Sequence, residues 1–182
     1  MSLIERDVEV LAAELGRRML ALHWRIATAE SCTGGLVAGA ITTIAGSSDW
    51  FDRGFVTYSN DSKRDLLGVA DAMLREHGAV SEPTAIAMAE GALIHGDATL
   101  AVSITGVAGP GGGTPSKPVG MVCFAWARRG DATISATHHL AGDRAEVRHA
   151  SVVIALRGLL DLAAAAGRNA MLGQRGANTR RR

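Results

Sequence analysis

A near-continuous apolar run between Ala98 and Thr105 constrains the fold of this chain more than any other stretch. The run lacks the polar alternation of a half-exposed strand, and its length is that of a buried β-strand. Strands of this kind lie inside a sheet that helices cover on both faces. The run therefore predicts an α/β domain with a buried central strand.

Helical and strand patterns alternate along the rest of the chain. Apolar spacing and capping residues predict helices over 4–15, 37–44, 59–67, 71–77 and 81–95 and from Asp143 onward. Strand patterns lie at 25–29, 54–58 and 98–105 and, as an antiparallel hairpin, at 119–127 and 133–140. This order predicts a three-layer α/β/α sandwich with a mixed central sheet.

The chain length fits one such domain. A chain of 182 residues buries roughly 70% of the surface that is exposed when it is unfolded, so it can build its own core. Helical periodicity is lost after Gly167, and the chain ends in Arg180-Arg181-Arg182. We therefore expect a single domain over residues 1–167, followed by a flexible basic tail over residues 168–182.

Charge and cysteine content narrow the classes of function. The 19 basic and 18 acidic residues give a net charge of +1, so no overall field favours nucleic acid or an anionic membrane. Cys32 and Cys123 are too few for a zinc motif, and the N-terminus lacks a signal-peptide pattern. Charged residues interrupt the apolar stretches well short of the roughly 20 residues that span a bilayer. We expect a cytoplasmic protein with no membrane partner.

The stretch from Trp24 to Leu36 has the pattern of a short strand that breaks directly into a helix. The break itself is Ser31-Cys32-Thr33-Gly34-Gly35. Unpaired N–H groups at a helix N-terminus favour hydroxyls and anions, and the glycines leave room for a substrate to approach the backbone. These features predict a functional site. The simpler interpretation is that Ser31 only caps the helix.

A glycine-rich loop from Gly106 to Pro118 directly follows the central strand. Ligands of α/β sheets collect beyond the carboxyl ends of the strands, so we expect this loop and Ser31 to face the same crevice. The alternative is an ordinary surface turn, because many glycine-rich loops have no other role.

A serine nucleophile needs a base, and the six histidines of this chain form no catalytic motif. Lys63 is the other candidate. An unperturbed lysine has a pKa of about 10.4, which is too high for an effective base, but desolvation or a neighbouring cation lowers it. The simpler interpretation of Lys63 is a solvated surface side chain.

Several ordered motifs resemble the CinA C-terminal-domain family. They are Thr28-Ala29-Glu30-Ser31-Cys32-Thr33-Gly34-Gly35, Gly46-Ser47-Ser48, Gly54-Phe55-Val56-Thr57-Tyr58-Ser59-Asn60 with Lys63, Gly78-Ala79-Val80-Ser81, and Gly106-Val107-Ala108-Gly109-Pro110 with Lys117-Pro118-Val119-Gly120. The resemblance covers roughly residues 5–165. Larger members carry an additional N-terminal domain of the molybdopterin-binding type, and this chain resembles the stand-alone form.

Members of that family include nicotinamide-nucleotide amidohydrolases, which convert nicotinamide mononucleotide and water to nicotinate mononucleotide and ammonia in pyridine-nucleotide salvage. The resemblance implies this activity, without a metal or organic cofactor. It implies Ser31 as nucleophile and Lys63 as base, with Tyr58 and Thr105 orienting this pair or the substrate. The implied oxyanion donors are the backbone N–H groups of Cys32, Thr33 and Gly34. The expected substrate contacts are Glu30, Gly35, Asn60, Gly106, Gly109, Arg144 and Arg148.

Three alternatives remain open at this point. Arg144 and Arg148 suit a phosphate group, but they could equally form the exposed face of the last helix. Cys32 is a second possible nucleophile, because helix N-termini activate thiolates, although the resemblance favours Ser31. The whole chain could also be a catalytically silent nucleotide-binding or interaction module.

The expected partners follow from the same observations. The resemblance implies a small pyridine nucleotide as substrate, and we expect a homo-oligomer, with a dimer as the first expectation. Nucleic-acid binding is suggested by the competence and damage association of the family and by the arginine tail. Neutral charge and an aromatic content of 4% disfavour it.

Overall fold

The computed structural model of the chain describes the backbone of residues 3–179 and the side chains of residues 6–166. The helices are α1 (Leu3–Leu22), α2 (Leu36–Thr42), α3 (Asn60–Leu67), α4 (Asp71–His77), α5 (Glu82–Ile94) and α6 (Arg144–Thr179). The strands are β1 (Ile26–Glu30), β2 (Phe51–Val56), β3 (Leu100–Gly106), β4 (Met121–Arg128) and β5 (Ile134–His139). A short 3-10 helix, Ser47–Asp49, precedes β2.

The strands form one mixed sheet in the order β2-β1-β3-β4-β5. β1 pairs in parallel with β2 and β3, and the predicted antiparallel hairpin is formed by β4 and β5. The register places Glu30 beside Val56 on one side and beside Ile104 on the other. The carboxyl ends of the three parallel strands therefore meet at one edge of the sheet, where α/β proteins bind ligands.

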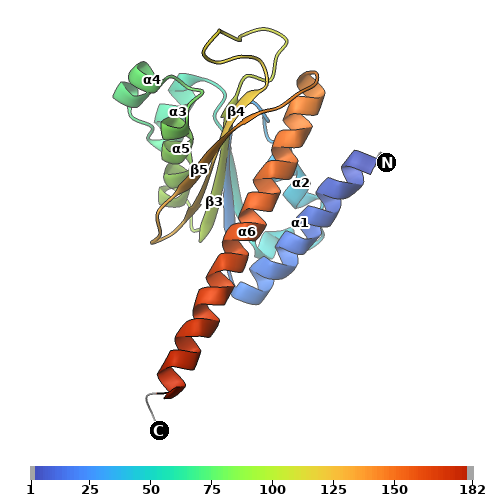
Figure 1. Cartoon of the computed structure of the whole chain (residues 1–182), viewed down its shortest axis with the longest axis vertical. Coiled ribbons are helices and arrows are strands. Elements are labelled where there is room, and N and C mark those ends of the chain that lie inside the picture. The colour runs from blue at the N-terminus through green and yellow to red at the C-terminus, as the bar shows by residue number, and fades with distance from the viewer. Residues whose placement is uncertain (1–2, 180–182) are drawn as a thin grey trace.

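Helices cover both faces of this sheet (Figure 1). α1, α2 and α6 lie on one face, and α3, α4 and α5 lie on the other. On β3, Leu100, Val102 and Ile104 face the first layer, whereas Ala101 faces the second, where α5 packs. Every residue of β3 except Gly106 is buried. The predicted α/β sandwich and its buried central strand are confirmed.

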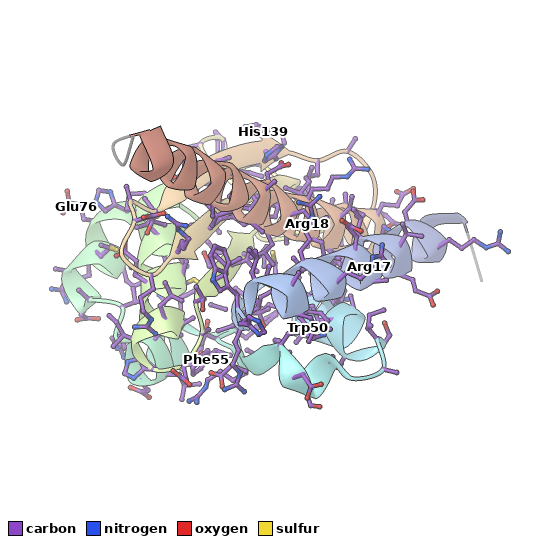
Figure 2. All side chains as sticks on the ribbon, turned by 90° about the horizontal axis from the view of Figure 1, so that it is seen from below. Arg17, Arg18, Trp50, Phe55, Glu76 and His139 are labelled. Atoms are coloured by element: carbon purple, nitrogen blue, oxygen red, sulfur yellow. The ribbon has the colours of Figure 1, made fainter. Side chains whose placement is uncertain are left out.

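α1 and α6 lie side by side across the sheet, as both views show (Figures 1 and 2). Gly16 lets α1 approach Trp50, because a Cβ atom at this position would lie 2.9 Å from the indole ring. Trp50 is 1% exposed and lies beneath α1 in Figure 2. The contact fixes the segment that leads into β2.

β2 begins at Phe51, three residues before the Gly54 start that the sequence predicts. Asp52 and Arg53 interrupt the apolar pattern there, which hides the strand from a sequence-based prediction. They are tolerated because β2 is an edge strand, and Asp52 forms ion pairs with Arg53 and Arg25.

α6 continues as helix to Thr179, whereas the loss of periodicity predicts its end near Gly167. Its last turns extend beyond the sheet in Figure 1. The terminal arginines, 180–182, lie outside the described residues. By length and composition, Arg144–Ala166 would also span a membrane, but Val147, Leu156 and Leu159 are buried against the sheet as in a core helix.

Candidate active site

Ser31 and Lys63 meet at the edge where the parallel strands end. Ser31 directly follows β1, and its backbone N–H donates to the carbonyl oxygen of Ile104 on β3 at 2.9 Å. Lys63 Nζ donates to Ser31 Oγ at 3.2 Å and to the carbonyl oxygen of Thr57 at 2.6 Å. The hydroxyl and the amine are thus within proton-transfer distance.

The position of Lys63 follows from a well-defined helix start. Ser59 and Ser62 form a reciprocal capping box at the beginning of α3, where the sequence offers Ser59, Asn60 or Asp61 as the capping residue. The box starts the helix directly after β2, and Lys63, one turn in, points toward the sheet edge. The interpretation of Lys63 as a solvated surface side chain is therefore wrong, since it is 1% exposed.

Burial changes the acid–base chemistry of this lysine. Desolvation lowers the pKa of Lys63 from 10.5 to about 8, and the nearby Cys32, the smaller of the two causes, opposes this effect. A substantial fraction of the amine is therefore neutral near physiological pH. Neutral Lys63 has a lone pair for the Ser31 proton, while its bond to the Thr57 carbonyl holds the nitrogen in place.

The break after β1 differs from a simple helix start. α2 begins only at Leu36, and Gly34 and Gly35 precede it with φ angles of 61° and 94°. These positive φ values favour glycine over residues with a Cβ atom. Ser31 is therefore not the N-cap of α2, and the interpretation that it only caps this helix is wrong.

Glu30 supplies the capping instead. Its carboxylate accepts from the backbone N–H groups of Gly35 (3.0 Å), Val37 (3.1 Å) and Ala38 (2.9 Å). The side chain is fully buried. Glu30 was expected to contact substrate, but both of its oxygens are engaged by α2, so its role is to hold the helix behind the turn. Gly35 was also expected to contact substrate, but its N–H donates to Glu30.

The turn from Ser31 to Gly35 presents two backbone donors. Gly34 N–H donates to the carbonyl oxygen of Ser31 at 3.0 Å, so it is not free for an oxyanion, contrary to expectation. The N–H groups of Cys32 and Thr33 donate to no other residue within 3–179. Two successive backbone donors directly after a serine are the kind of group that an oxyanion hole requires.

Two arginines at the start of α6 reach the same edge. Arg148 donates from Nε to the carbonyl oxygen of Cys32 (3.1 Å) and from Nη2 to that of Thr33 (3.0 Å). Arg144 donates to the carbonyl oxygen of Gly109 and to the hydroxyl of Tyr58, both at 2.9 Å. Neither arginine is a detached surface group, although Arg144 is solvent-exposed. Asp143 caps α6 as predicted and so fixes this end.

A cavity of about 620 Å³ opens beside these arginines. It lies between the glycine-rich loop and the beginning of α6. Its lining residues are Ala108, Gly109, Pro110, Val119, Gly142, Asp143, Arg144, Ala145 and Arg148. Its volume lies in the range of pockets for small organic ligands.

Residues 8–163 match the family model of the CinA C-terminal domain. The chain belongs to the CinA C-terminal-domain family. The match spans every strand and includes Ser31, Lys63 and the start of α6.

Named relatives agree with this membership. The chain is 48% identical over 155 residues to the nicotinamide-nucleotide amidohydrolase PncC of Escherichia coli K12, covering 85% of this chain and 94% of that protein. It is 50% identical over 151 residues to a CinA-like protein of Syntrophobacter fumaroxidans, covering 83% of this chain but only 35% of that relative. The chain thus spans about a third of the length of the longer CinA-like protein.

Solved structures show the same fold. The crystal structure of the competence/damage inducible protein CihA from Agrobacterium tumefaciens superimposes with a TM-score of 0.85 at 49% sequence identity. The superposition covers 89% of this chain and 99% of that one. The CinA C-terminal fold is therefore present over nearly the whole described chain.

The remaining predicted residues of this CinA domain are distributed around the site. The Thr105 hydroxyl donates to the carbonyl oxygen of Ala79 at 2.8 Å, which secures the segment before α5 rather than the Ser31–Lys63 pair. Asn60 is exposed at the start of α3. Gly106 ends β3 so close to β4 that a Cβ atom would lie 2.8 Å from the Met121 carbonyl oxygen.

Thr57 is a site residue that the sequence reasoning missed. Its carbonyl oxygen is the second acceptor for Lys63, and its side chain is fully buried. Its position directly after β2, at a carboxyl strand end, was the available signal.

Within the described residues, no group of three or more His, Cys, Asp or Glu side chains is arranged to hold a metal ion.

Proposed function

We propose that this protein is an amidohydrolase that converts nicotinamide mononucleotide to nicotinate mononucleotide and ammonia, with Ser31 as nucleophile and Lys63 as base. The observation that carries the proposal is the buried pair itself, Lys63 Nζ at 3.2 Å from Ser31 Oγ, beside two backbone N–H groups that bond to no other described residue. Relatives named nicotinamide-nucleotide amidohydrolase support the substrate class.

The first half-reaction transfers the acyl group to the serine. Neutral Lys63 accepts the Ser31 proton as Oγ attacks the carboxamide carbon, and the N–H groups of Cys32 and Thr33 stabilise the oxyanion. The tetrahedral adduct then expels its nitrogen. Lys63 gives the proton to this leaving group, and ammonia departs to leave a nicotinoyl ester on Ser31.

The second half-reaction releases the acid. Lys63 takes a proton from a water molecule as that water attacks the ester carbon, and the same two N–H groups stabilise the second adduct. The bond to Ser31 Oγ breaks, the proton returns to the serine, and nicotinate mononucleotide leaves. One water is consumed and one ammonia is formed, so the steps balance the overall hydrolysis.

Ser31 is a better nucleophile candidate than its neighbour Cys32. Burial raises the pKa of the Cys32 thiol to about 11, because the apolar surroundings disfavour the thiolate. The Cys32 side chain is 6% exposed and packs in the core cluster of the α1/α6 layer. Its thiol therefore stays protonated and turned away from solvent at neutral pH.

Arg144 is the candidate contact for the phosphate of the substrate. It is exposed, lines the 620 Å³ cavity, and holds Gly109 and Tyr58 with separate guanidinium nitrogens. A phosphate group suits the same fork of donors. Arg148 lines the cavity too, but it is less exposed than Arg144 and holds two consecutive carbonyl oxygens of the turn.

Ammonia release from a panel of substrates tests this function. Purified protein should release ammonia from nicotinamide mononucleotide and much less from nicotinamide riboside, which lacks the phosphate, with free nicotinamide and NAD as further comparisons. Chelators should leave the rate unchanged. Calorimetric binding of the mononucleotide without ammonia release would contradict the proposal and favour a silent nucleotide-binding module.

A further inference from the structure

Arg148 was expected to bind substrate, but its contacts point to a different role. Its guanidinium group binds the carbonyl oxygens of Cys32 and Thr33, two consecutive residues of the turn that follows Ser31. Arg148 comes from α6, 116 positions away from Cys32 in the sequence. A contact over this separation fixes the turn relative to the body of the protein.

The contact determines which way the peptide groups face. In a trans peptide unit the C=O and the following N–H point in opposite directions. Arg148 holds the Cys32 carbonyl, so the N–H of Thr33 must point away from the guanidinium. The Ser31 carbonyl is held in turn by Gly34 N–H at 3.0 Å, which fixes the N–H of Cys32.

Three consecutive peptide units are thus fixed through their carbonyl oxygens, while the N–H groups of Cys32 and Thr33 are left over. A donor whose direction is set before substrate arrives needs no reorganisation in the transition state. The guanidinium charge on the carbonyl side also polarises the peptide and strengthens its N–H donor.

We infer that Arg148 is a positioning residue that orients and polarises the oxyanion-binding peptides. This inference rests on the proposed amidohydrolase function, and it assigns phosphate recognition to Arg144 alone. Glu30 holds the other end of the same turn through Gly35 and α2, so the turn is clamped from both sides.

Steady-state kinetics on nicotinamide mononucleotide separate positioning from substrate binding. Arg148→Gln should lower kcat by about tenfold to a hundredfold, somewhat less than the loss of an oxyanion donor itself, with KM nearly unchanged. The pH midpoint set by Lys63 should not move. Arg157→Gln, an exposed arginine on the same helix, is the matched control and should match wild type.

Chemical rescue distinguishes the loss of the guanidinium group from misfolding of the variant. Guanidinium chloride at tens of millimolar, well below denaturing concentration, should restore part of the kcat of Arg148→Ala and leave wild type and Arg157→Gln unaffected. Arg148→Lys should recover less than guanidinium does, because one ammonium cannot reproduce the planar fork on two carbonyls.

The outcomes are distinguishable. An unchanged kcat with a raised KM in Arg148→Gln would make Arg148 a substrate contact and overturn this inference alone. Loss of activity without rescue, together with a lowered melting temperature, would show a purely structural role and also overturn it. A wild-type protein that releases no ammonia would instead overturn the proposed function, and this inference with it.

Discussion

The side-chain amine of Lys63 bridges the hydroxyl of Ser31, at 3.2 Å, and the backbone carbonyl of Thr57, at 2.6 Å. These three groups come from α3 and from the ends of two adjacent parallel strands. The sheet register brings the strand ends together. The capping box starts α3 directly after β2, which places Lys63 beside these strand ends. Burial then makes that lysine a usable base, because the charged form is the one that desolvation disfavours.

The first prediction concerns the pH dependence of activity. Lys63 must be neutral to accept the Ser31 proton, and its pKa is lowered to about 8. The value of kcat/KM should therefore rise with pH and level off above a midpoint near 8. Initial rates of ammonia release between pH 6 and pH 10 measure this dependence. The observed midpoint should lie within roughly one pH unit of 8. A profile that falls with rising pH would argue against a lysine base.

The second prediction concerns stability. Between about pH 8 and 10.5 the unfolded chain still holds the Lys63 proton that the folded protein has released, so rising pH stabilises the fold in this window. Below pH 8 both states are protonated and the folded state bears the cost of a buried charge. Wild type should therefore gain stability relative to Lys63→Met from pH 7 to pH 10, by up to about 3 kcal/mol.

Urea unfolding of both proteins measures the part of this gain that develops between pH 7 and pH 9. The Cys32 thiol, with its pKa raised to about 11, has the opposite effect between pH 9 and 11, because the unfolded chain loses that proton first. Lys63 and Cys32 influence each other, so the two proteins are compared below pH 9, where the Cys32 thiol is largely protonated in both states. Parallel curves would mean that the lysine titrates alike in the folded and unfolded states.

The third prediction separates the two adjacent nucleophile candidates. Cys32→Ala should keep kcat within about threefold of wild type, since the buried thiol stays protonated and takes no part in the chemistry. Ammonia release under saturating substrate measures the rate, and thiol alkylation of the wild type provides an independent check. An inactive but folded Cys32→Ala variant would reassign the nucleophile.

The fourth prediction concerns Glu30. Its buried carboxylate accepts three backbone hydrogen bonds, and Glu30→Gln turns an amide NH₂ toward at least one of those donors. The variant should lose about 1–3 kcal/mol of unfolding free energy, the cost of a buried unsatisfied donor. Denaturant unfolding checks this, with Glu76→Gln, an exposed residue labelled in Figure 2, as the control. Equal stabilities would show that the carboxylate does not hold α2.

The fifth prediction tests the phosphate contact. Arg144→Gln should raise KM for nicotinamide mononucleotide by about tenfold to a hundredfold, the worth of a charged hydrogen bond. KM for nicotinamide riboside should stay the same, because that substrate has no phosphate for Arg144 to bind. Arg157→Gln again provides the control. Equal increases for both substrates would place Arg144 elsewhere on the ligand.

Much of the fold could be predicted because its signals are local. Ser59, Ser81 and Asp143 each cap the helix that their sequence context predicts. The buried strand β3 follows from its uninterrupted apolar run. β2 was predicted too short, because this edge strand tolerates an exposed Arg53 and an Asp52 whose carboxylate is paired with Arg53 and Arg25.

The site could be predicted only where its residues share a local pattern. The polar residues and glycines of the turn after β1 indicate a site at Ser31. The burial of Lys63 depends instead on where α3 packs, which no local pattern encodes. The roles of Glu30 and Arg148 are non-local in the same sense. Glu30 bonds with residues five to eight positions ahead, and Arg148 reaches back across 116 positions. The family resemblance, and for Arg148 the affinity of arginine for phosphate, led to the expectation that each contacts substrate.

The most direct test of the Ser31–Lys63 mechanism is ammonia release from nicotinamide mononucleotide by wild type, Ser31→Ala and Lys63→Ala, with circular dichroism to confirm that each variant is folded. The mechanism predicts release by wild type and loss of at least about a thousandfold in both variants. Turnover by a folded Ser31→Ala variant at a rate near wild type would contradict it.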